Sequence, residues 1–318
     1  MRKLIYISIL IFVSNCVSAQ QLRQYTQYVY NPSLFNPSEV VSDNNLSIVG
    51  NLRTQWAGLD GAPSTQAVGV LAPLNRDRIG LGIQLLRSTI GIQEKLDANA
   101  MYAYKLRINE QTSFALGIQV NVRRFTNDFT DPRLIALDGI LADPSVYNTI
   151  LTKTILNGGL GFRFQTGKTY VAASVPRILK SSIDSDEDNF IAREIRHLYV
   201  SAGSEININS NWNFQPHTLI KYAEKSPPTI DIWTGFIYRE QIHLATNYSF
   251  GGRSSQLLES IDMILGLKIN ERIFASLAFD FTLTPLKDYE NGSFELFLRY
   301  TLGPEKLPPI LTDNPREF

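Results

Sequence analysis

Three histidines, His197, His217 and His243, are the side chains of this 318-residue chain best suited to general acid–base chemistry. A hydrolytic triad needs a nucleophile, a base and an orienting group within hydrogen-bonding reach, and the nucleophile motif G-x-S-x-G is absent. The histidines lie in three separate segments, so nothing in the sequence brings one of them to a serine and an aspartate. We interpret them as members of polar hydrogen-bond networks and expect no catalytic site.

Residues that could bind a metal ion or a phosphate also lack the spacing that such a site requires. The acidic run Asp184–Asp188 opens like a calcium loop, but Asn189 occupies the position of the required glycine and Ile195 that of the closing glutamate. The motif H-E-x-x-H is absent, and Cys16 is the only cysteine. The glycines of Gly158–Gly161 lie in an alternating segment, where they favour sheet curvature or close approach of another segment over phosphate binding. We therefore expect no metal and no cofactor.

Charge and hydropathy narrow the class of protein. The 30 basic and 30 acidic residues give a formal net charge of +0, which argues against nucleic acid as a partner. The mean hydropathy of −0.08 resembles that of a soluble protein, but membrane β-barrels hide their apolar half by alternation. After residue 19, no stretch approaches the roughly 18 apolar residues of a membrane helix. If the chain crosses a membrane, it must therefore do so as a closed barrel, because lipid offers no other partners for the hydrogen bonds of the backbone N–H and C=O groups.

Alternation of apolar and polar residues predicts strands over most of the chain. In the segment Thr112–Arg123, Phe114 and Leu116 share one face, whereas Gln119 and Asn121 share the other. The fold class that we predict is all-β, a transmembrane antiparallel up-and-down β-barrel of about 14 strands with a short N-terminal segment outside the barrel strands. The predicted strands are 46–55, 65–72, 78–87, 95–107, 112–124, 153–165, 168–175, 194–207, 211–222, 228–238, 240–250, 260–270, 272–283 and 292–302.

The predicted connections alternate between long and short. Long gaps occur at 88–94, 125–152 and 176–193, and short gaps occur at 166–167 and 208–210. Outer-membrane barrels have short turns in the periplasm and long loops outside. A soluble β-sandwich, the alternative, has no reason to sort its connections in this way.

The first residues form a Sec signal peptide, predicted at 1–19. Arg2 and Lys3 precede the apolar run Leu4–Val13, and Val17-Ser18-Ala19 is a cleavage site of small residues. The alternatives are a retained anchor helix and a lipoprotein modified at Cys16.

The remaining chain divides into three predicted parts. Residues 20–45 are polar and aromatic, which predicts a short helix or an irregular segment, either in the periplasm or folded into the barrel as a plug. Residues 46–302 form the barrel. Residues 303–318 contain four prolines and cannot extend a sheet. We expect a periplasmic tail there, which either binds a periplasmic partner or has no role.

Two motifs, residues 28–37 (YVYNPSLFNP) and 53–66 (RTQWAGLDGAPSTQ), resemble the PorP/SprF family of Bacteroidetes outer-membrane proteins, which is linked to type IX secretion and gliding motility. The second motif also has a physical interpretation, since its glycines and proline define a tight loop and its tryptophan is a large amphipathic side chain. Such a loop either binds a partner or packs onto the barrel rim. The candidate partner-binding residues are Tyr30, Asn31, Asn36, Pro37, Arg53, Trp56, Gly58, Gly61 and Pro63.

The resemblance implies a non-enzymatic barrel of the type IX secretion or gliding system, located in the outer membrane. It would help to export or anchor secreted proteins or adhesins with C-terminal sorting domains, gripped by the outer loops 125–152 and 176–193. Implied partners are that C-terminal domain, periplasmic components including an OmpA-like peptidoglycan-binding protein, and outer-membrane lipid. Two alternatives stay open: a passive porin-like solute channel, which mixed lumenal charge suits, and a lipid hydrolase that uses a lumenal histidine.

Overall fold

A computed structural model describes residues 25–42, 45–74, 78–134, 149–180, 194–224, 226–251 and 258–302. The predicted signal peptide, the C-terminal tail and the acidic run Asp184–Asp188 lie outside the described residues, as do residues 135–148 and 181–193 of the two longest predicted loops. In the described part of the chain, no helix is long and apolar enough to cross a membrane.

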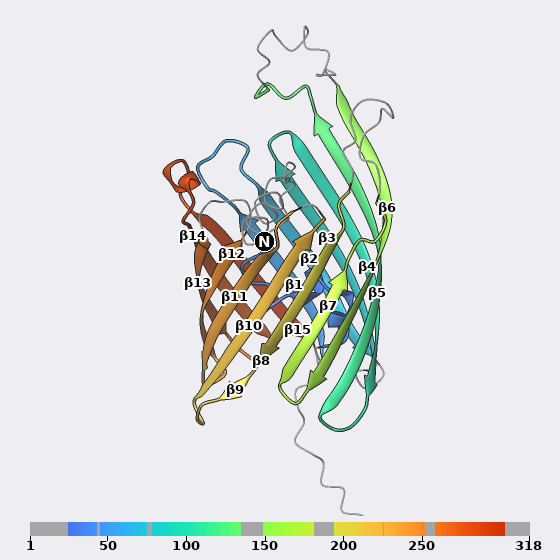
Figure 1. The fold of residues 1–318 in the computed structure, drawn as a ribbon, viewed down its shortest axis with the longest axis vertical. Coiled ribbons are helices and arrows are strands. Elements are labelled where there is room, and N and C mark those ends of the chain that lie inside the picture. Colours follow the sequence, from blue (N-terminus) through green and yellow to red (C-terminus); the bar gives the residue numbers. More distant parts are fainter. Residues whose placement is uncertain are drawn as a thin grey trace, which may run out of the picture.

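The described residues form a single antiparallel sheet of 15 strands that closes on itself, because the first strand pairs with the last (Figure 1). Strands β8 and β9 both pair with β10 and are separated only by Glu205, so they act as one of 14 barrel strands. The strands are β1 (Leu46–Thr54), β2 (Ser64–Leu74), β3 (Ile79–Ile90), β4 (Gln93–Arg107), β5 (Thr112–Asp128), β6 (Ile150–Thr166), β7 (Thr169–Val175), β8 (His197–Ser204), β9 (Ile206–Asn207), β10 (Trp212–Ala223), β11 (Thr229–Tyr238), β12 (Ile242–Gly251), β13 (Leu258–Lys268), β14 (Ile273–Thr282) and β15 (Ser293–Leu302).

The predicted barrel and all 14 of its predicted strands are confirmed, with one clear difference in a connection. The long gap expected at 88–94 is a tight turn at Gly91 and Ile92, because β3 continues to Ile90 and β4 begins at Gln93. Gly91 closes this turn with a φ of +54°, a conformation that glycine adopts without steric cost.

Alternate side chains of each strand face out of and into the barrel. On β5, Leu116, Ile118 and Val120 are more than half exposed on the outer face, whereas Asn121 and Arg123 are buried on the inner face. An apolar outer face and a polar inner face are what a barrel in lipid requires.

Connections of different length lie at opposite ends of the barrel (Figure 1). One end, here called the loop end, has the β1–β2, β5–β6, β7–β8 and β14–β15 connections, the last with a 3₁₀ helix, η3 (Pro285–Asp288). The other, the turn end, has tight turns. Three of these turns share one device: the Oδ1 atom of an asparagine accepts hydrogen bonds from the backbone N–H groups two and three residues later. These asparagines are Asn109, Asn209 and Asn270.

Residues 25–42, here called the lumenal segment, lie inside the barrel (Figure 1). They contain two 3₁₀ helices, η1 (Pro32–Leu34) and η2 (Pro37–Val41), each of which begins at a proline. Proline suits a first helical position because its φ is already fixed and its missing N–H is not needed there. The Asn36 side chain caps η2 by accepting a hydrogen bond from the Ser38 N–H at 3.0 Å. Residues 25–42 thus lie outside the barrel strands, as predicted for the N-terminal segment.

Candidate functional site in the barrel lumen

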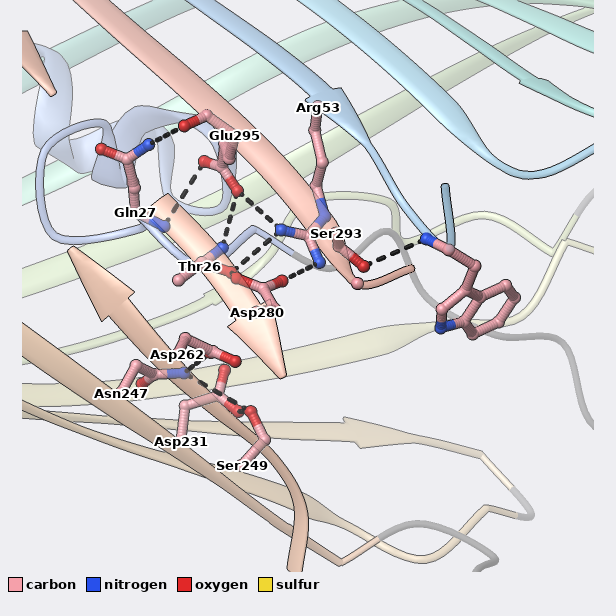
Figure 2. Close-up of polar contacts among 12 residues, drawn as sticks. Thr26, Gln27, Arg53, Asp231, Asn247, Ser249, Asp262, Asp280, Ser293 and Glu295 are labelled. Atoms are coloured by element: carbon pink, nitrogen blue, oxygen red, sulfur yellow. Dashed lines mark hydrogen bonds and ion pairs between the residues drawn. The ribbon is translucent and has the colours of Figure 1, made fainter. Parts of the chain in front are cut away.

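A buried ion-pair cluster lies on the inner wall where the barrel closes. The Arg53 guanidinium on β1 lies 2.5 Å from the Asp280 carboxylate on β14 and 3.1 Å from the Glu295 carboxylate on β15 (Figure 2). All three side chains are almost fully buried. One cation between two carboxylates leaves a formal charge of −1, so further donors are needed to stabilise the oxygens.

The lumenal segment supplies those donors. The Thr26 N–H donates to Glu295 at 2.8 Å, and the Thr26 hydroxyl donates to Asp280 at 2.7 Å (Figure 2). The Gln27 side-chain amide donates to the backbone carbonyl of Glu295 at 2.9 Å, and Arg53 also donates to the Thr26 hydroxyl. The start of the segment is therefore held in the half of the barrel nearer the loop end.

Polar side chains continue along the inner wall from this cluster. Asn247 donates to Asp262 at 2.8 Å, and the Ser249 hydroxyl donates to Asp231 at 2.8 Å (Figure 2). Lys221 on β10 lies 2.7 Å from Asp231. The buried charges of Lys221, Asp231 and Asp262 are thus paired or hydrogen-bonded, as burial requires.

A second buried cluster involves the connection between β7 and β8. Arg123 on β5 pairs with Asp97 on β4 and lies 2.6 Å from Glu194, which precedes β8. Glu194 is also 2.9 Å from Arg177, and Asn157 on β6 donates to it at 2.9 Å. The two described ends of this connection are therefore fastened to the inner wall of β5 and β6.

The far end of the lumenal segment packs tightly against the turn half of the barrel. A Cβ atom on Gly80 would lie 2.6 Å from the Val40 carbonyl oxygen, and one on Gly117 would overlap the backbone of Pro37 and Ser38. Only glycine permits such close approach of two backbones. An ion pair of 2.8 Å between Glu39 and Arg163 on β6 completes the contact.

Aromatic rings fill the middle of the lumen. Tyr30 packs against Trp233, His243, Phe274 and Phe297, on four different elements of the wall. Burial raises the pKa of Tyr30 well above its ordinary value of 10.0, which keeps the hydroxyl neutral. Next to Tyr28, Phe35 and Tyr199, the hollow between segment and wall measures about 20 Å³, which is enough for one or two waters.

The three histidines face the lumen, as predicted, but contact different partners. His197 packs on Tyr199, His217 lies 3.1 Å from the Tyr170 hydroxyl, and His243 lies 3.4 Å from the Tyr30 hydroxyl. Among the residues that the structure describes, no three His, Cys, Asp or Glu side chains are arranged to hold a metal ion.

The sequence-predicted partner-binding residues fall into two groups. Those of the lumenal segment and β1 are buried inside the barrel, where Asn31 donates to Asn51 at 2.8 Å and Asn36 donates to the Phe162 carbonyl at 3.1 Å. This group is Tyr30, Asn31, Asn36, Pro37 and Arg53. The second group, Trp56, Gly58, Gly61 and Pro63, lies in the β1–β2 connection at the loop end and is partly or fully exposed. Only the second group is open to a partner from outside, and its binding role stays a prediction.

The β1–β2 connection is joined to its neighbours in what we call the loop rim, residues 55–63, 91–92, 129–134 and 283–292. The Ala57 N–H donates to the Gly292 carbonyl at 2.8 Å, and the Asn291 N–H donates back to the Ala57 carbonyl at 2.7 Å. The Trp56 N–H donates to the Ser293 hydroxyl at 3.1 Å (Figure 2). On the other side, the Gly91 N–H donates to the Gly61 carbonyl at 2.8 Å. Backbone hydrogen bonds thus connect the β1–β2 connection with the β14–β15 connection on one side and with the β3–β4 turn on the other.

Mixed charge in the lumen is predicted from the sequence, but the partners of Asp280, Glu295 and Arg123 are not. Thr26 and Arg177 lie outside the predicted strands, and Glu194 is the first residue of one, so no run of alternating residues assigns them a face. Their roles depend on contacts between parts of the chain that are distant in sequence, and a single sequence carries no signal for those.

A closed barrel with an apolar outer wall, a filled polar lumen and long loops at one end defines an outer-membrane β-barrel, with the loop end outside. The chain belongs to the PorP/SprF family of type IX secretion system membrane proteins, whose family model matches residues 17–300. The family resemblance noted in the sequence is therefore confirmed.

Solved structures with a similar fold include three outer-membrane proteins. The toluene transporter TodX of Pseudomonas putida matches at 12% identity and a TM-score of 0.48, over 85% of this chain and 93% of that chain. Omp33 of Acinetobacter baumannii matches at 8% identity and a TM-score of 0.47, over 81% of this chain and 98% of that chain. A FadL homologue of Pseudomonas aeruginosa matches at 10% identity and a TM-score of 0.45, over 88% of this chain and 94% of that chain. No curated protein matches the chain.

Proposed function

We propose that this barrel is a non-enzymatic anchor of the type IX secretion or gliding system, which holds the C-terminal domain of a secreted protein or adhesin at the cell surface. Membership of the family supports a role in the system. The observation that carries the anchor role is the lumenal segment inside the barrel, which is held on one side by hydrogen bonds from Thr26 to the buried Asp280 and Glu295 and on the other by the ion pair between Glu39 and Arg163.

A conduit needs free space along its axis, and the lumenal segment crosses the described lumen from one wall to another. The lumenal segment contacts β1, β14 and β15 through Thr26 and Gln27, and β6 through Glu39. The described ends of the β7–β8 connection occupy another part of the lumen, where Glu194 pairs with Arg123 and Arg177. These contacts favour a fixed scaffold over the porin-like alternative, which stays the second proposal.

We place cargo binding at the loop rim and the loops beside it. An ordered surface loses less conformational entropy on binding than a flexible one, and hydrogen bonds connect the rim loops. Trp56 and the outer loops 125–152 and 176–193 would grip the cargo domain from this side. The turn end, and the tail at 303–318, would contact periplasmic components such as an OmpA-like peptidoglycan-binding protein.

The direct test is capture of a purified cargo C-terminal domain by the detergent-solubilised barrel. We expect capture by the wild type and substantial loss when the loops 125–152 and 176–193 are both shortened. Trp56→Ala should weaken capture, whereas the matched control Trp212→Ala, at the turn end, should not. Undiminished capture after shortening both loops would contradict the proposed grip.

A further inference from the structure

An apolar hollow with two arginines at its edge nearer the loop end lies on the outer, lipid-facing wall of β1 to β5. It measures about 590 Å³, and Leu85, Ala98, Val122, Arg87 and Arg124 are among its lining residues. Ala98 lies between Leu85 and Val122 in the strand register, so a small side chain separates two larger ones. That arrangement leaves a groove wide enough for an acyl chain.

The two arginines sit where the outer wall changes from apolar to polar. Arg87 on β3 and Arg124 on β5 each follow three exposed apolar side chains in the direction of the loop end. Both guanidinium groups are therefore at the edge of the apolar band. The apolar side chains are Leu81, Ile83 and Leu85 on β3, and Ile118, Val120 and Val122 on β5.

Register places the two guanidinium groups side by side. Arg87 pairs directly with Leu96 on β4, and Leu96 pairs directly with Arg124 on β5. Two strand spacings separate the arginine backbones by about 10 Å. Glu94 lies 2.5 Å from Arg87. The Arg87 side chain is still about half exposed. Arg124 has no ion pair or hydrogen bond with any residue that the structure describes, and it is exposed.

From this geometry we propose that the hollow binds a phosphorylated glycolipid of the outer leaflet. The loop end of an outer-membrane barrel lies in that leaflet, so the arginines are at the depth of the lipid headgroups. Arginine is the side chain best suited to phosphate, because its planar fork donates two parallel hydrogen bonds. The phosphate would contact Arg124 and Arg87, and an acyl chain would lie along Ala98.

A larger hollow on the same wall provides a comparison. It measures about 870 Å³ and is lined by residues of β11 to β15 and β1, with no arginine or lysine among them. It has room for acyl chains but no group for a phosphate. The charge at β3 and β5 therefore distinguishes the proposed site from ordinary contact with lipid.

The test measures binding of purified lipid A to the full barrel in mild detergent, by native mass spectrometry. We expect Arg87→Gln/Arg124→Gln to bind at least about tenfold more weakly than wild type. The control Arg239→Gln/Arg272→Gln removes the same charge from exposed turns at the turn end and should bind like wild type. Arg124→Lys, which keeps the charge, should bind better than Arg124→Gln. Heat-modified mobility on gels checks that each variant is folded.

Two other lipids identify the ligand. Dephosphorylated lipid A should bind wild type as weakly as lipid A binds the double variant. Phosphatidylglycerol should bind more weakly than lipid A. Equal binding of lipid A by wild type and the double variant would overturn the proposal, and so would equal binding of the dephosphorylated form or of phosphatidylglycerol. The proposal is independent of cargo capture, which uses the loop rim.

Discussion

The Arg53 guanidinium and the Asp280 carboxylate are 227 positions apart in sequence and 2.5 Å apart in the lumen. Glu295, on the strand between them, is the second carboxylate on the same guanidinium. The cluster therefore spans the place where the last strands meet the first. Because Thr26 also donates to both carboxylates, the same cluster holds the lumenal segment.

Replacing Arg53 by methionine should strongly destabilise the barrel. The change leaves Asp280 and Glu295 buried without their cation, and breaking a buried ion pair costs about 3–5 kcal/mol. Urea unfolding in lipid vesicles, followed by tryptophan fluorescence, measures the loss.

The matched control is Lys168→Met, which removes an exposed ion pair with Glu205. Exposed pairs contribute about 0–1 kcal/mol, so this variant should unfold close to wild type. Equal losses in the two variants would show that the Arg53 cluster has no special role.

Gly117→Val should displace the lumenal segment. The new side chain would overlap the backbone of Pro37 and Ser38, which no change of rotamer can relieve. We expect a loss of about 1–3 kcal/mol and faster proteolysis within residues 25–42. The control Gly158→Ala places its Cβ 3.6 Å from the nearest atom, an ordinary contact. Unchanged proteolysis of the valine variant would mean that the segment does not depend on this contact.

The barrel could be predicted from the sequence because each strand carries its own signal. Leu116, Ile118 and Val120 alternate with polar residues whatever their partners are, since one face meets lipid and the other the lumen. The ends of β3 and β4 nearest the loop end, which lie in the predicted gap 88–94, were not predicted. Thr89 and Ile90 are β-branched and extend the strand, but their polar neighbours break the alternation that marks strands within the membrane.

The lumenal contacts could not be predicted for a different reason. Tyr30 and Arg53 are in motifs that suggested a partner-binding surface, and the structure buries both. Polar and aromatic side chains suit an exposed surface and a polar lumen equally well. The choice depends on pairs such as Thr26 and Glu295, which are 269 positions apart and which no local pattern connects.

The contact between Asp131 and Arg133 at the loop rim should persist to unusually low pH. A hydrogen bond from Arg133 lowers the pKa of Asp131 from 3.8 to about 2. A lowered pKa means that the contact is fully present above pH 3.8 and is lost as the pH falls through about 2. Carboxyl NMR should show Asp131 titrating near 2, and Arg133→Gln should return it towards 3.8. An ordinary titration in wild type would contradict this contact.

Replacing His197, His217 and His243 together by glutamine should leave cargo capture unchanged. Each histidine contacts a different tyrosine, Tyr199, Tyr170 or Tyr30, so the three do not share a substrate site. Capture is compared with wild type after heat-modified mobility confirms folding. Loss of capture in a folded triple variant would contradict this prediction, and release of fatty acid from lipid by wild type but not by the triple variant would favour the hydrolase alternative.

Deleting residues 20–45 should open the lumen. The deletion removes Thr26, Glu39 and the aromatic packing of Tyr30, which together connect opposite walls. In planar bilayers we expect little conductance from wild type and clear single channels from the deletion variant. Gly158→Ala again serves as the closed control. A wild-type barrel that already conducts as well as the deletion variant would favour the porin-like channel over the anchor, because the lumenal segment would then leave a continuous aqueous path.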